Sequence, residues 1–386
     1  MLHPLLSCSS WSSEQQPAQH IINYNTTTVA STTTSFVKPV QYYKTEMMAD
    51  LSKGPLANIL QNSIENILSA EQQVQDKDVA PRENDDFALD KFWQDMNVIT
   101  QKLSFECTKV GICFTKSPVP TPSETSSLMT GVEGAVLAMV SVYFRLSPKY
   151  GSVLRSNVRH AVVRAIQAAR NLLKVIKDEG GEAVAERYHH STGIVWQGCG
   201  SLEVCPRDNK AAVLKELRGQ NSLVSDAFTE ISEAMEGDGS GWNCMGVDSD
   251  DGMEEDEKWT NEDKDLIGPS VNLIKAAKIL YKRVLAAVEK NGSCTGEDKV
   301  KELDQLYEDC NLVSRTVDTL ILELYPPLNV SSMEEQSHYL ANLLRTALKT
   351  CIHSHIVSEA EQPHIEFVYK AIDHNLDRMK EKLSEK

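Results

Sequence analysis

The sequence predicts an all-α protein made of long antiparallel helices in up-and-down bundles. Apolar residues recur at three- and four-residue spacing through segments of about 20–30 residues. No segment alternates apolar and polar residues as a half-buried strand does, and aromatic residues make up only 6% of the chain. Because short turns separate the helical segments, neighbouring helices are expected to run antiparallel.

Residues 49–236 are expected to hold about five helices. The first lies near 56–68. The second spans about 85–114, with an apolar face that includes Phe92 and Leu103. Both segments have the spacing of amphipathic helices that bury one face.

The third helix has the most complete start signal in the chain. Thr121 can cap it, Pro122 suits the first turn, and Glu124 can complete a capping box. The Ser-Pro pair at 147–148 repeats the cap-plus-proline signal before a fourth helix over 151–178.

The fourth helix carries small residues, such as Ala161 and Ala165, within its apolar stripe. A neighbouring helix is therefore expected to approach it closely. Residues 182–205 are the least readable part of the chain, because several glycines interrupt a mixed pattern, and they are not counted among the five helices. A fifth helix is expected over about 206–235, opened by a proline.

Residues 260–386 are expected to form about four more helices. Thr260 caps the first, a capping box of Ser332 and Glu335 starts the third, and the last follows Pro363.

The second helix of this group, about 295–325, carries a heptad run. Such a run suits a zipper with a partner helix, but core packing is favoured because the chain has many helices of its own to cover it. The run consists of Leu303, Leu306, Cys310, Val313, Val317, Leu320 and Leu324.

Two segments differ in composition from the helical parts. Residues 1–48 are rich in serine and threonine and nearly uncharged, so we expect a disordered extension, and whether it belongs to the natural protein stays open. Residues 237–259 are expected to form an acidic, flexible linker between domains 49–236 and 260–386. The interval Glu236–Asp265 holds twelve acidic residues and two lysines, so it carries ten of the sixteen net negative charges. The independence of the two helical groups and self-association stay open.

The composition argues against several functions. A net charge of −16 does not favour nucleic acid, which needs clustered Lys and Arg. No run approaches the roughly 20 uninterrupted apolar residues of a membrane span. Nine scattered cysteines are typical of reduced thiols in a cytosolic or nuclear protein. No phosphate-binding glycine loop or nucleophile elbow is present, so neither catalysis nor a cofactor is expected.

The sequence predicts no metal site. The pairs Glu186–His189 and Glu361–His364 have a di-iron spacing, but a proline interrupts the second pair and a glycine-broken stretch adjoins the first. The 351–355 segment holds a cysteine and two histidines, but one histidine points off the shared helix face and a fourth ligand is missing.

The candidate partner-binding residues are basic or aromatic. Arg155, Arg159, Arg170 and Lys174 form a stripe beside the apolar face of the fourth helix. This stripe could dock an acidic partner, although the ordinary interpretation is the solvated face of an amphipathic helix.

Two tryptophans and two hydroxyl groups complete the candidate sites. Trp242 and Trp259 bracket the acidic run and suit partner binding, while Trp259 could also staple the helix that follows it. Ser117 and Thr121 each precede a proline, which fits proline-directed phosphorylation.

Several strings resemble one known family, the cyclin-D-binding proteins. The resemblance covers about residues 85–386 and depends on the order of the strings around the acidic linker. They are Pro118-x-Pro120-x-Pro122-x-Glu124, Arg207-Asp208-Asn209-Lys210-Ala211-Ala212, Leu324-Tyr325-Pro326-Pro327 and Ala371-Ile372-Asp373-His374.

The resemblance implies a nuclear and cytoplasmic regulator that binds D-type cyclins and helix-loop-helix transcription factors. Such a protein would restrain cyclin-dependent kinase signalling toward the retinoblastoma protein and dampen transcription. No residue-level binding site is carried over. The alternative is a structural adaptor of the cytoskeleton or cell junctions, similar to the vinculin and α-catenin bundles, which also consist of long helices.

Overall fold

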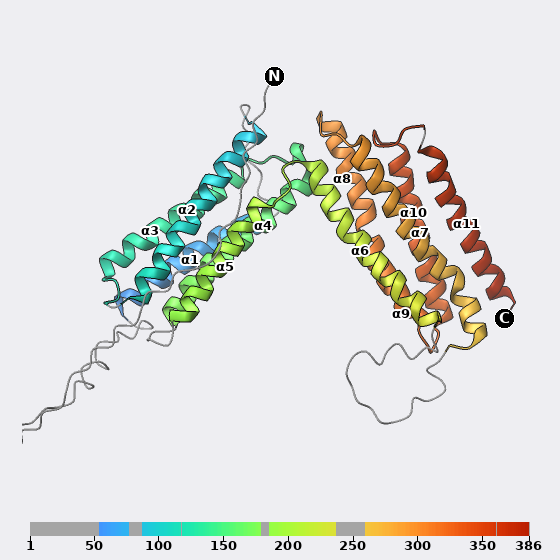
Figure 1. Ribbon diagram of the computed structural model, residues 1–386, viewed down its shortest axis with the longest axis horizontal. Coiled ribbons are helices and arrows are strands. Elements are labelled where there is room, and N and C mark those ends of the chain that lie inside the picture. The colour runs from blue at the N-terminus through green and yellow to red at the C-terminus, as the bar shows by residue number, and fades with distance from the viewer. Residues whose placement is uncertain are drawn as a thin grey trace, which may run out of the picture. The chain divides into compact units, whose positions relative to one another are not determined.

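The computed structural model describes residues 54–76, 87–116, 118–178, 185–236, 259–359 and 361–385. All of them belong to one compact unit, Ala49–Lys386. The predicted extension 1–48, the linker residues 237–258, Ser117 and Trp242 lie outside the described residues. The elements run in the order α1 (Pro55–Gln75), α2 (Leu89–Thr115), α3 (Pro122–Tyr143), the 3-10 turn η2 (Pro148–Tyr150), α4 (Ser152–Asp178), α5 (Ala185–Glu203), α6 (Asn209–Glu236), α7 (Asn261–Asn291), α8 (Glu297–Asn311), α9 (Val313–Leu324), α10 (Val330–Ile352) and α11 (Gln362–Ser384) (Figure 1).

The all-α prediction is confirmed, since the described residues contain helices and turns but no strand. No helix was predicted at 182–205, but α5 occupies this segment. Its glycines serve packing: a Cβ on Gly198 would lie 3.2 Å from Ala165 Cα, so α4 and α5 pack backbone to backbone there. The expected close neighbour of the small residues on α4 is therefore α5.

The helix expected over 295–325 is two helices, α8 and α9, which meet at Leu312. Tyr281 of α7 donates its hydroxyl to the Cys310 carbonyl (2.7 Å) at the point where α8 ends. A side chain inserted into the backbone ladder is a common cause of a helix break. All seven heptad residues are fully buried, which confirms the core interpretation of that run.

The helix starts confirm two predicted caps, show the third capping a short 3-10 turn, and correct the fourth. The capping box of Thr121 and Glu124 is present, as is the cap at Thr260. The Ser-Pro pair at 147–148 opens η2, and α4 starts only at Ser152. The cap of α10 is Asn329, whose side-chain oxygen accepts from the Ser332 backbone (3.2 Å), so a Ser332–Glu335 box is wrong.

Helices α1–α5 form an N-terminal bundle. In it α1 packs on α3 and α4, α2 packs on α3 and α5, and α4 packs on α5. By length and composition α3 could cross a membrane, with a mean hydropathy of 1.3 over its most apolar stretch. Such a helix is weak evidence for a span, because a core helix passes the same test and α3 packs on both α1 and α2.

Helices α6–α11 form a C-terminal bundle. Although α6 precedes the acidic segment in the chain, it packs mainly on α7, α8 and α9. In the same bundle α7 also packs on α11, and α10 packs on α8, α9 and α11. Packing thus groups α6 with the helices that follow the acidic segment.

The two bundles are joined through the start of α4. Asp304 of α8 accepts hydrogen bonds from the backbone N–H groups of Ser152 (2.7 Å) and Val153 (3.2 Å). Asn209 of α6 accepts from Leu154 N–H (3.0 Å) and donates to Asp304 (2.8 Å). Gly151 has φ +119, and a Cβ there would lie 2.0 Å from the Asn209 side chain, so this position requires glycine.

Candidate protein-interaction surfaces

One side of α2 faces solvent with large apolar side chains. Val98, Phe105 and Ile112 are 66%, 64% and 45% exposed. Residues seven apart lie on the same side of a helix, so the three form one stripe along α2. The opposite side of α2, with Phe92 and Leu103, is buried.

Trp196 of α5 extends this stripe sideways. Its indole Nε1–H donates to Thr108 Oγ1 at 2.9 Å, and the side chain is 54% exposed. Thr108 comes three residues after Phe105 and four before Ile112, so the hydrogen bond holds the indole beside both. Apolar side chains from two helices therefore form one exposed area.

Lysines border the apolar stripe. Lys102 and Lys109 are also seven residues apart on α2, and Lys116, the C-cap, directly follows the last residue of the helix. The Lys109 ammonium lies 5.7 Å from the centre of the Phe105 ring and pairs with Glu106. Lys102 and Lys116 form no ion pair with any residue that the structure describes. We call these three lysines with Val98, Phe105, Ile112 and Trp196 the α2–α5 surface.

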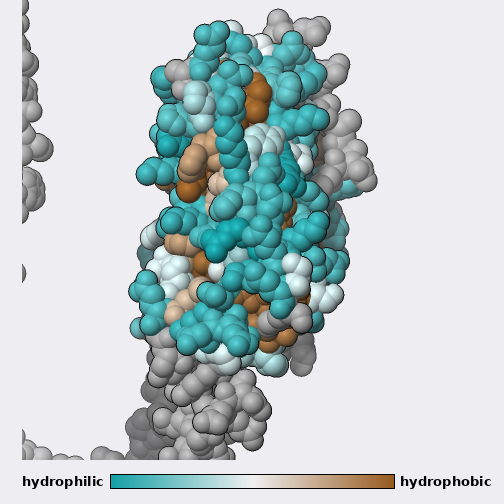
Figure 2. Space-filling model, turned by 90° about the vertical axis from the view of Figure 1, so that its right-hand side faces the viewer, coloured by the Kyte–Doolittle hydropathy of each residue, from teal (hydrophilic) through white to brown (hydrophobic). Residues whose placement is uncertain are grey.

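The C-terminal bundle presents a different kind of surface. Figure 2 shows a face on which hydrophilic residues predominate and hydrophobic residues appear as separate patches. Exposed apolar residues occur singly on its helices, among them Phe367 on α11, Tyr339 on α10 and Leu322 on α9. Scattered apolar residues of this kind are normal on protein surfaces.

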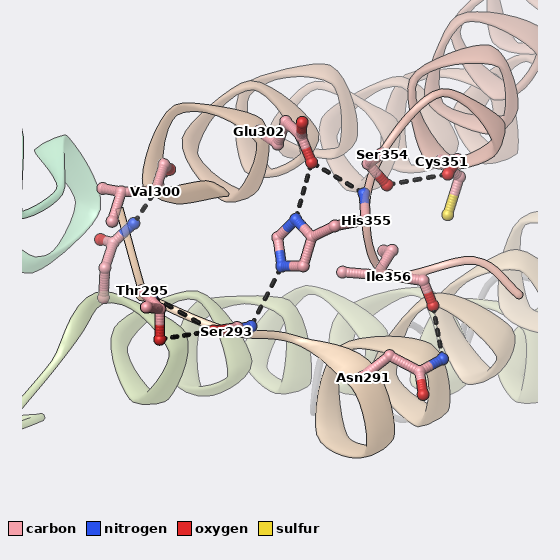
Figure 3. Close-up of polar contacts among 10 residues, drawn as sticks. Asn291, Ser293, Thr295, Val300, Glu302, Cys351, Ser354, His355 and Ile356 are labelled. Carbon is pink, nitrogen blue, oxygen red and sulfur yellow. Dashed lines mark hydrogen bonds and ion pairs between the residues drawn. The ribbon is translucent and has the colours of Figure 1, made fainter. Parts of the chain in front are cut away.

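The polar side chains at one end of this bundle surround His355 (Figure 3). The ring Nδ1 lies 2.6 Å from Glu302 Oε2, which also accepts from the His355 backbone N–H (2.7 Å). The Ser293 backbone N–H donates to Nε2 at 3.0 Å. Because a backbone N–H can only donate, Nε2 must be the acceptor, which places the ring proton on Nδ1, facing Glu302.

These contacts stabilise the ionised form of the Glu302 carboxylate. Partial burial by itself raises the pKa of this carboxyl, but the backbone N–H and the ring of His355 outweigh burial and hold the pKa below its ordinary value. His355 thus connects α8 with the α7–α8 and α10–α11 loops. We call Ser293, Glu302 and His355 the His355 network.

A second set of contacts adjoins this network. Asn291 donates to the Ile356 carbonyl (2.7 Å) and to Glu361 (3.1 Å). The Ser358 backbone N–H and hydroxyl donate to Glu361, and with Lys290 they lower the pKa of its carboxyl to about 2. Of these residues, Lys290 and Glu361 also line a cavity of about 340 Å³ between α7, α10 and α11.

Four residues of the metal-like motifs, Cys351, His353, His355 and Glu361, have structural contacts, whereas Glu186, His189 and His364 are exposed. No group of three or more His, Cys, Asp or Glu side chains that could hold a metal ion occurs in the described part of the chain. Burial raises the pKa of the Cys351 thiol to about 12, and His353 hydrogen-bonds the Lys349 carbonyl of its own helix. His355 and Glu361 have the partners given above.

Two members of the basic stripe of α4 form contacts within the fold. Arg170 forms an ion pair with Glu71 of α1 (2.9 Å), whose carboxylate also accepts from Gln167 (2.7 Å). Arg155 donates to the Leu146 carbonyl and lies 4.7 Å from the centre of the Tyr143 ring.

The other two members of the stripe have fewer contacts within the fold. Arg159 is half-buried and bonds Ser156 (3.3 Å), whereas Lys174 is exposed. The four residues therefore do not form one continuous exposed stripe. Whether any of them touches a partner stays a prediction.

Trp259 is an anchor within the C-terminal bundle. It is buried, donates from Nε1 to the Leu324 carbonyl (2.8 Å) and stacks on Tyr325 with ring centres 5.1 Å apart. Thr121 is exposed, and its hydroxyl is engaged with Glu124 in the capping box. A phosphate on Thr121 would face that carboxylate, and phosphorylation there stays a prediction.

The α2–α5 surface was not predicted from the sequence. The seven-residue spacing of Val98, Phe105 and Ile112 is visible in the sequence, but so is the stronger apolar face that includes Phe92 and Leu103. A helix with apolar residues on two sides is ambiguous until its neighbours are known. Trp196 lies in the segment for which no helix was predicted.

Comparison with known proteins shows similarity along most of the chain. Residues 95–237 match the family model described as Grap2 and cyclin-D-interacting, N-terminal, and residues 246–349 match its C-terminal counterpart. A Xenopus laevis protein named Cyclin-D1-binding protein 1 homolog is 31% identical, over 83% of this chain and 97% of its own length. The Homo sapiens protein named Cyclin-D1-binding protein 1 is 29% identical, over 78% of this chain and 87% of its own length.

Proposed function

The chain belongs to the Grap2 and cyclin-D-interacting family, and from that premise we propose that it is a regulator that acts by binding a D-type cyclin. The observation that carries the proposal is the extent of the similarity: the match spans 97% of a relative whose name states cyclin D1 binding. The α2–α5 surface supports it, because exposed apolar side chains in one area are typical of a protein-binding site.

Direct binding is the first test. Purified full-length protein is titrated against an immobilised D-type cyclin, with an A-type cyclin as the control. We expect saturable binding with a Kd of about 10 μM or tighter, and weaker binding to the control. Absence of binding to the D-type cyclin at roughly 50 μM would contradict the proposal.

We propose further that binding restrains the partner by sequestration rather than by catalysis. A cyclin held by this chain is unavailable to its kinase, so phosphorylation of the retinoblastoma protein should fall as the chain is added. The same action on helix-loop-helix transcription factors would dampen transcription. A kinase assay with purified components tests the first effect, and an unchanged rate at saturating chain would contradict it.

The proposal places the protein in both nucleus and cytoplasm, where D-type cyclins and transcription factors could be met. Imaging of the tagged chain tests this placement. Co-sedimentation with actin, in the absence of cyclin binding, would instead support the structural-adaptor alternative.

A further inference from the structure

We propose that the α2–α5 surface binds an amphipathic helix whose apolar face is bordered by acidic side chains. This inference rests on the proposed function in one respect: it gives a protein partner of this chain a place to dock.

The apolar stripe has the dimensions of a helix-binding site. Successive members Val98, Phe105 and Ile112 are two turns apart, or about 10 Å along α2 at 1.5 Å per residue. The stripe is therefore about 20 Å long, which a partner helix of about four turns would cover. Apolar anchors at three- and four-residue spacing on such a helix would follow this stripe.

The α5 side leaves room for the side chains of the partner. Gly193 and Gly200 lie three residues before and four residues after Trp196, on the same face of α5. A Cβ added at either glycine would meet no atom within 4 Å. The exposed indole is therefore flanked by bare backbone, against which partner side chains can pack closely.

The charges indicate an acidic partner. Residues 97–116, which comprise most of α2 and its C-cap, include three lysines and one acid, Glu106, which is paired with Lys109. On α5 one exposed acid, Glu203, lies seven residues after Trp196, so the lysines outnumber the acids at this surface. The chain as a whole has a net charge of −16, which repels acidic partners at long range. Salt screens charges beyond about 8 Å at physiological ionic strength, so at contact the nearby lysines decide the interaction.

A second copy of this chain fits the surface less well. A two-fold contact brings the same patch against itself, which would place Lys109 against Lys109 and Lys102 against Lys116. Like charges across an interface are unfavourable, so the lysines disfavour self-association through this surface.

The experiment uses the full chain and two synthetic helical peptides labelled for fluorescence anisotropy. Both peptides carry leucine at positions 1, 5, 8 and 12 of the helix; one has glutamates beside the leucines and the other has lysines at the same places. We expect the glutamate peptide to bind at least about tenfold more tightly, with the preference decreasing as salt rises. Equal affinities, or no binding of the glutamate peptide, would overturn the proposal.

Three groups of variants locate the binding. The double variant Phe105→Ala with Trp196→Ala removes the anchors, and Lys102→Glu with Lys116→Glu reverses the charges. Gly200→Leu fills the space beside Trp196, and leucine has a higher helix propensity than glycine, so this variant keeps its fold. We expect each to weaken binding of the glutamate peptide about tenfold or more.

Matched controls lie on the C-terminal bundle. Phe367→Ala removes an apolar side chain that is 63% exposed on α11, and Gly219→Leu fills open space beside α6. Both should bind the glutamate peptide like the unaltered chain. Unchanged binding in Gly200→Leu and in the Phe105/Trp196 variant would overturn the proposal.

The same variants, titrated against a D-type cyclin, separate the two proposals. If all surface variants bind the D-type cyclin and also bind the glutamate peptide like the unaltered chain, this inference fails and the proposed function stands. If the unaltered chain binds the glutamate peptide at this surface but no D-type cyclin, the proposed function fails and this inference stands. Dimerisation that disappears in the Phe105/Trp196 variant would assign the surface to a second copy and overturn the inference.

Discussion

The α2–α5 surface and the His355 network both gather side chains that could bind something, but they differ in what those side chains already contact. In the network, both ring nitrogens of His355 and the Glu302 carboxylate have hydrogen-bond partners within the chain. On the α2–α5 surface, Phe105 and Val98 are about two-thirds exposed and Lys102 has no ion-pair partner among the described residues.

The difference separates a structural role from a binding role. A half-buried polar group with all its partners present holds loops in place, and removing it leaves those partners unsatisfied. An exposed apolar group costs little to remove, but it has area left to bury against another molecule. Stability measurements should therefore respond to the first region, and binding measurements to the second.

The largest loss of stability is expected at the most deeply buried ion pair. Arg170→Leu leaves the Glu71 carboxylate, whose side chain is 5% exposed, without its cationic partner. Breaking a buried ion pair from one side costs about 3 kcal/mol of unfolding free energy. Urea unfolding followed by circular dichroism measures it, with Lys174→Ala as the control.

This variant also tests the predicted docking role of the α4 stripe. If Arg170 is structural, the folded variant binds a D-type cyclin as the unaltered chain does. Weaker binding with unchanged stability would show instead that Arg170 touches the partner.

A somewhat smaller loss is expected within the His355 network. His355→Ala removes the ring contacts to Glu302 and to the Ser293 N–H, while the backbone N–H of residue 355 still bonds Glu302, and it should lower the unfolding free energy by about 2 kcal/mol. His338→Ala, on the exposed side of α10, is the matched control and should change it by less than about 0.5 kcal/mol. Equal effects of the two variants in urea unfolding would show that His355 contributes no more to stability than an exposed histidine does.

The next largest loss of stability is expected at the junction between the two bundles. Asp304→Ala removes the carboxylate that accepts from the first N–H groups of α4, and loss of a helix cap costs about 1–2 kcal/mol. Asp377→Ala, exposed on α11, is the control. Thermal unfolding measures both, and an Asp304→Ala midpoint that matches the control would show that this cap contributes nothing.

The pH dependence should report on Glu361. Its pKa is lowered to about 2 from 4.5, so the folded state favours the ionised carboxylate. The resulting stability is fully present above about pH 5 and is lost as the pH falls toward about 2. With allowance for solvent screening, we expect the ionised Glu361 carboxylate to contribute about 1 kcal/mol to the unfolding free energy. Glu361→Gln should lack this part of the acid destabilisation in urea unfolding between about pH 5 and about pH 3, and an unchanged pH profile would contradict the assignment.

The smallest effect on stability is expected at the α2–α5 surface. Val98→Ala and Phe105→Ala remove side chains that are mostly exposed already, so the unfolding free energy should change by less than about 0.5 kcal/mol each. The same Phe105 substitution is expected to weaken partner binding. A loss of more than about 2 kcal/mol in urea unfolding would show that this surface is covered within the chain.

Much of the fold could be predicted because helices are encoded locally. The spacing of apolar residues placed α1 to α4, α6 and α7, and the Thr121–Glu124 box fixed the start of α3. The heptad run was correctly assigned to the core, although its helix is broken at Leu312. That break and the packing glycines of α5 depend on contacts with distant helices, which local spacing does not reveal.

The candidate site could be predicted only in part. The sequence by itself determined that α2 is amphipathic and that lysines recur every seven residues, at positions 102, 109 and 116. Only the tertiary structure decided that α3 and α5 leave Val98, Phe105 and Ile112 uncovered, that Arg170 is paired with Glu71, and that Trp259 is buried against Tyr325. The physical reason is that a side chain's type and period are local properties, whereas its exposure depends on which distant helix packs over it.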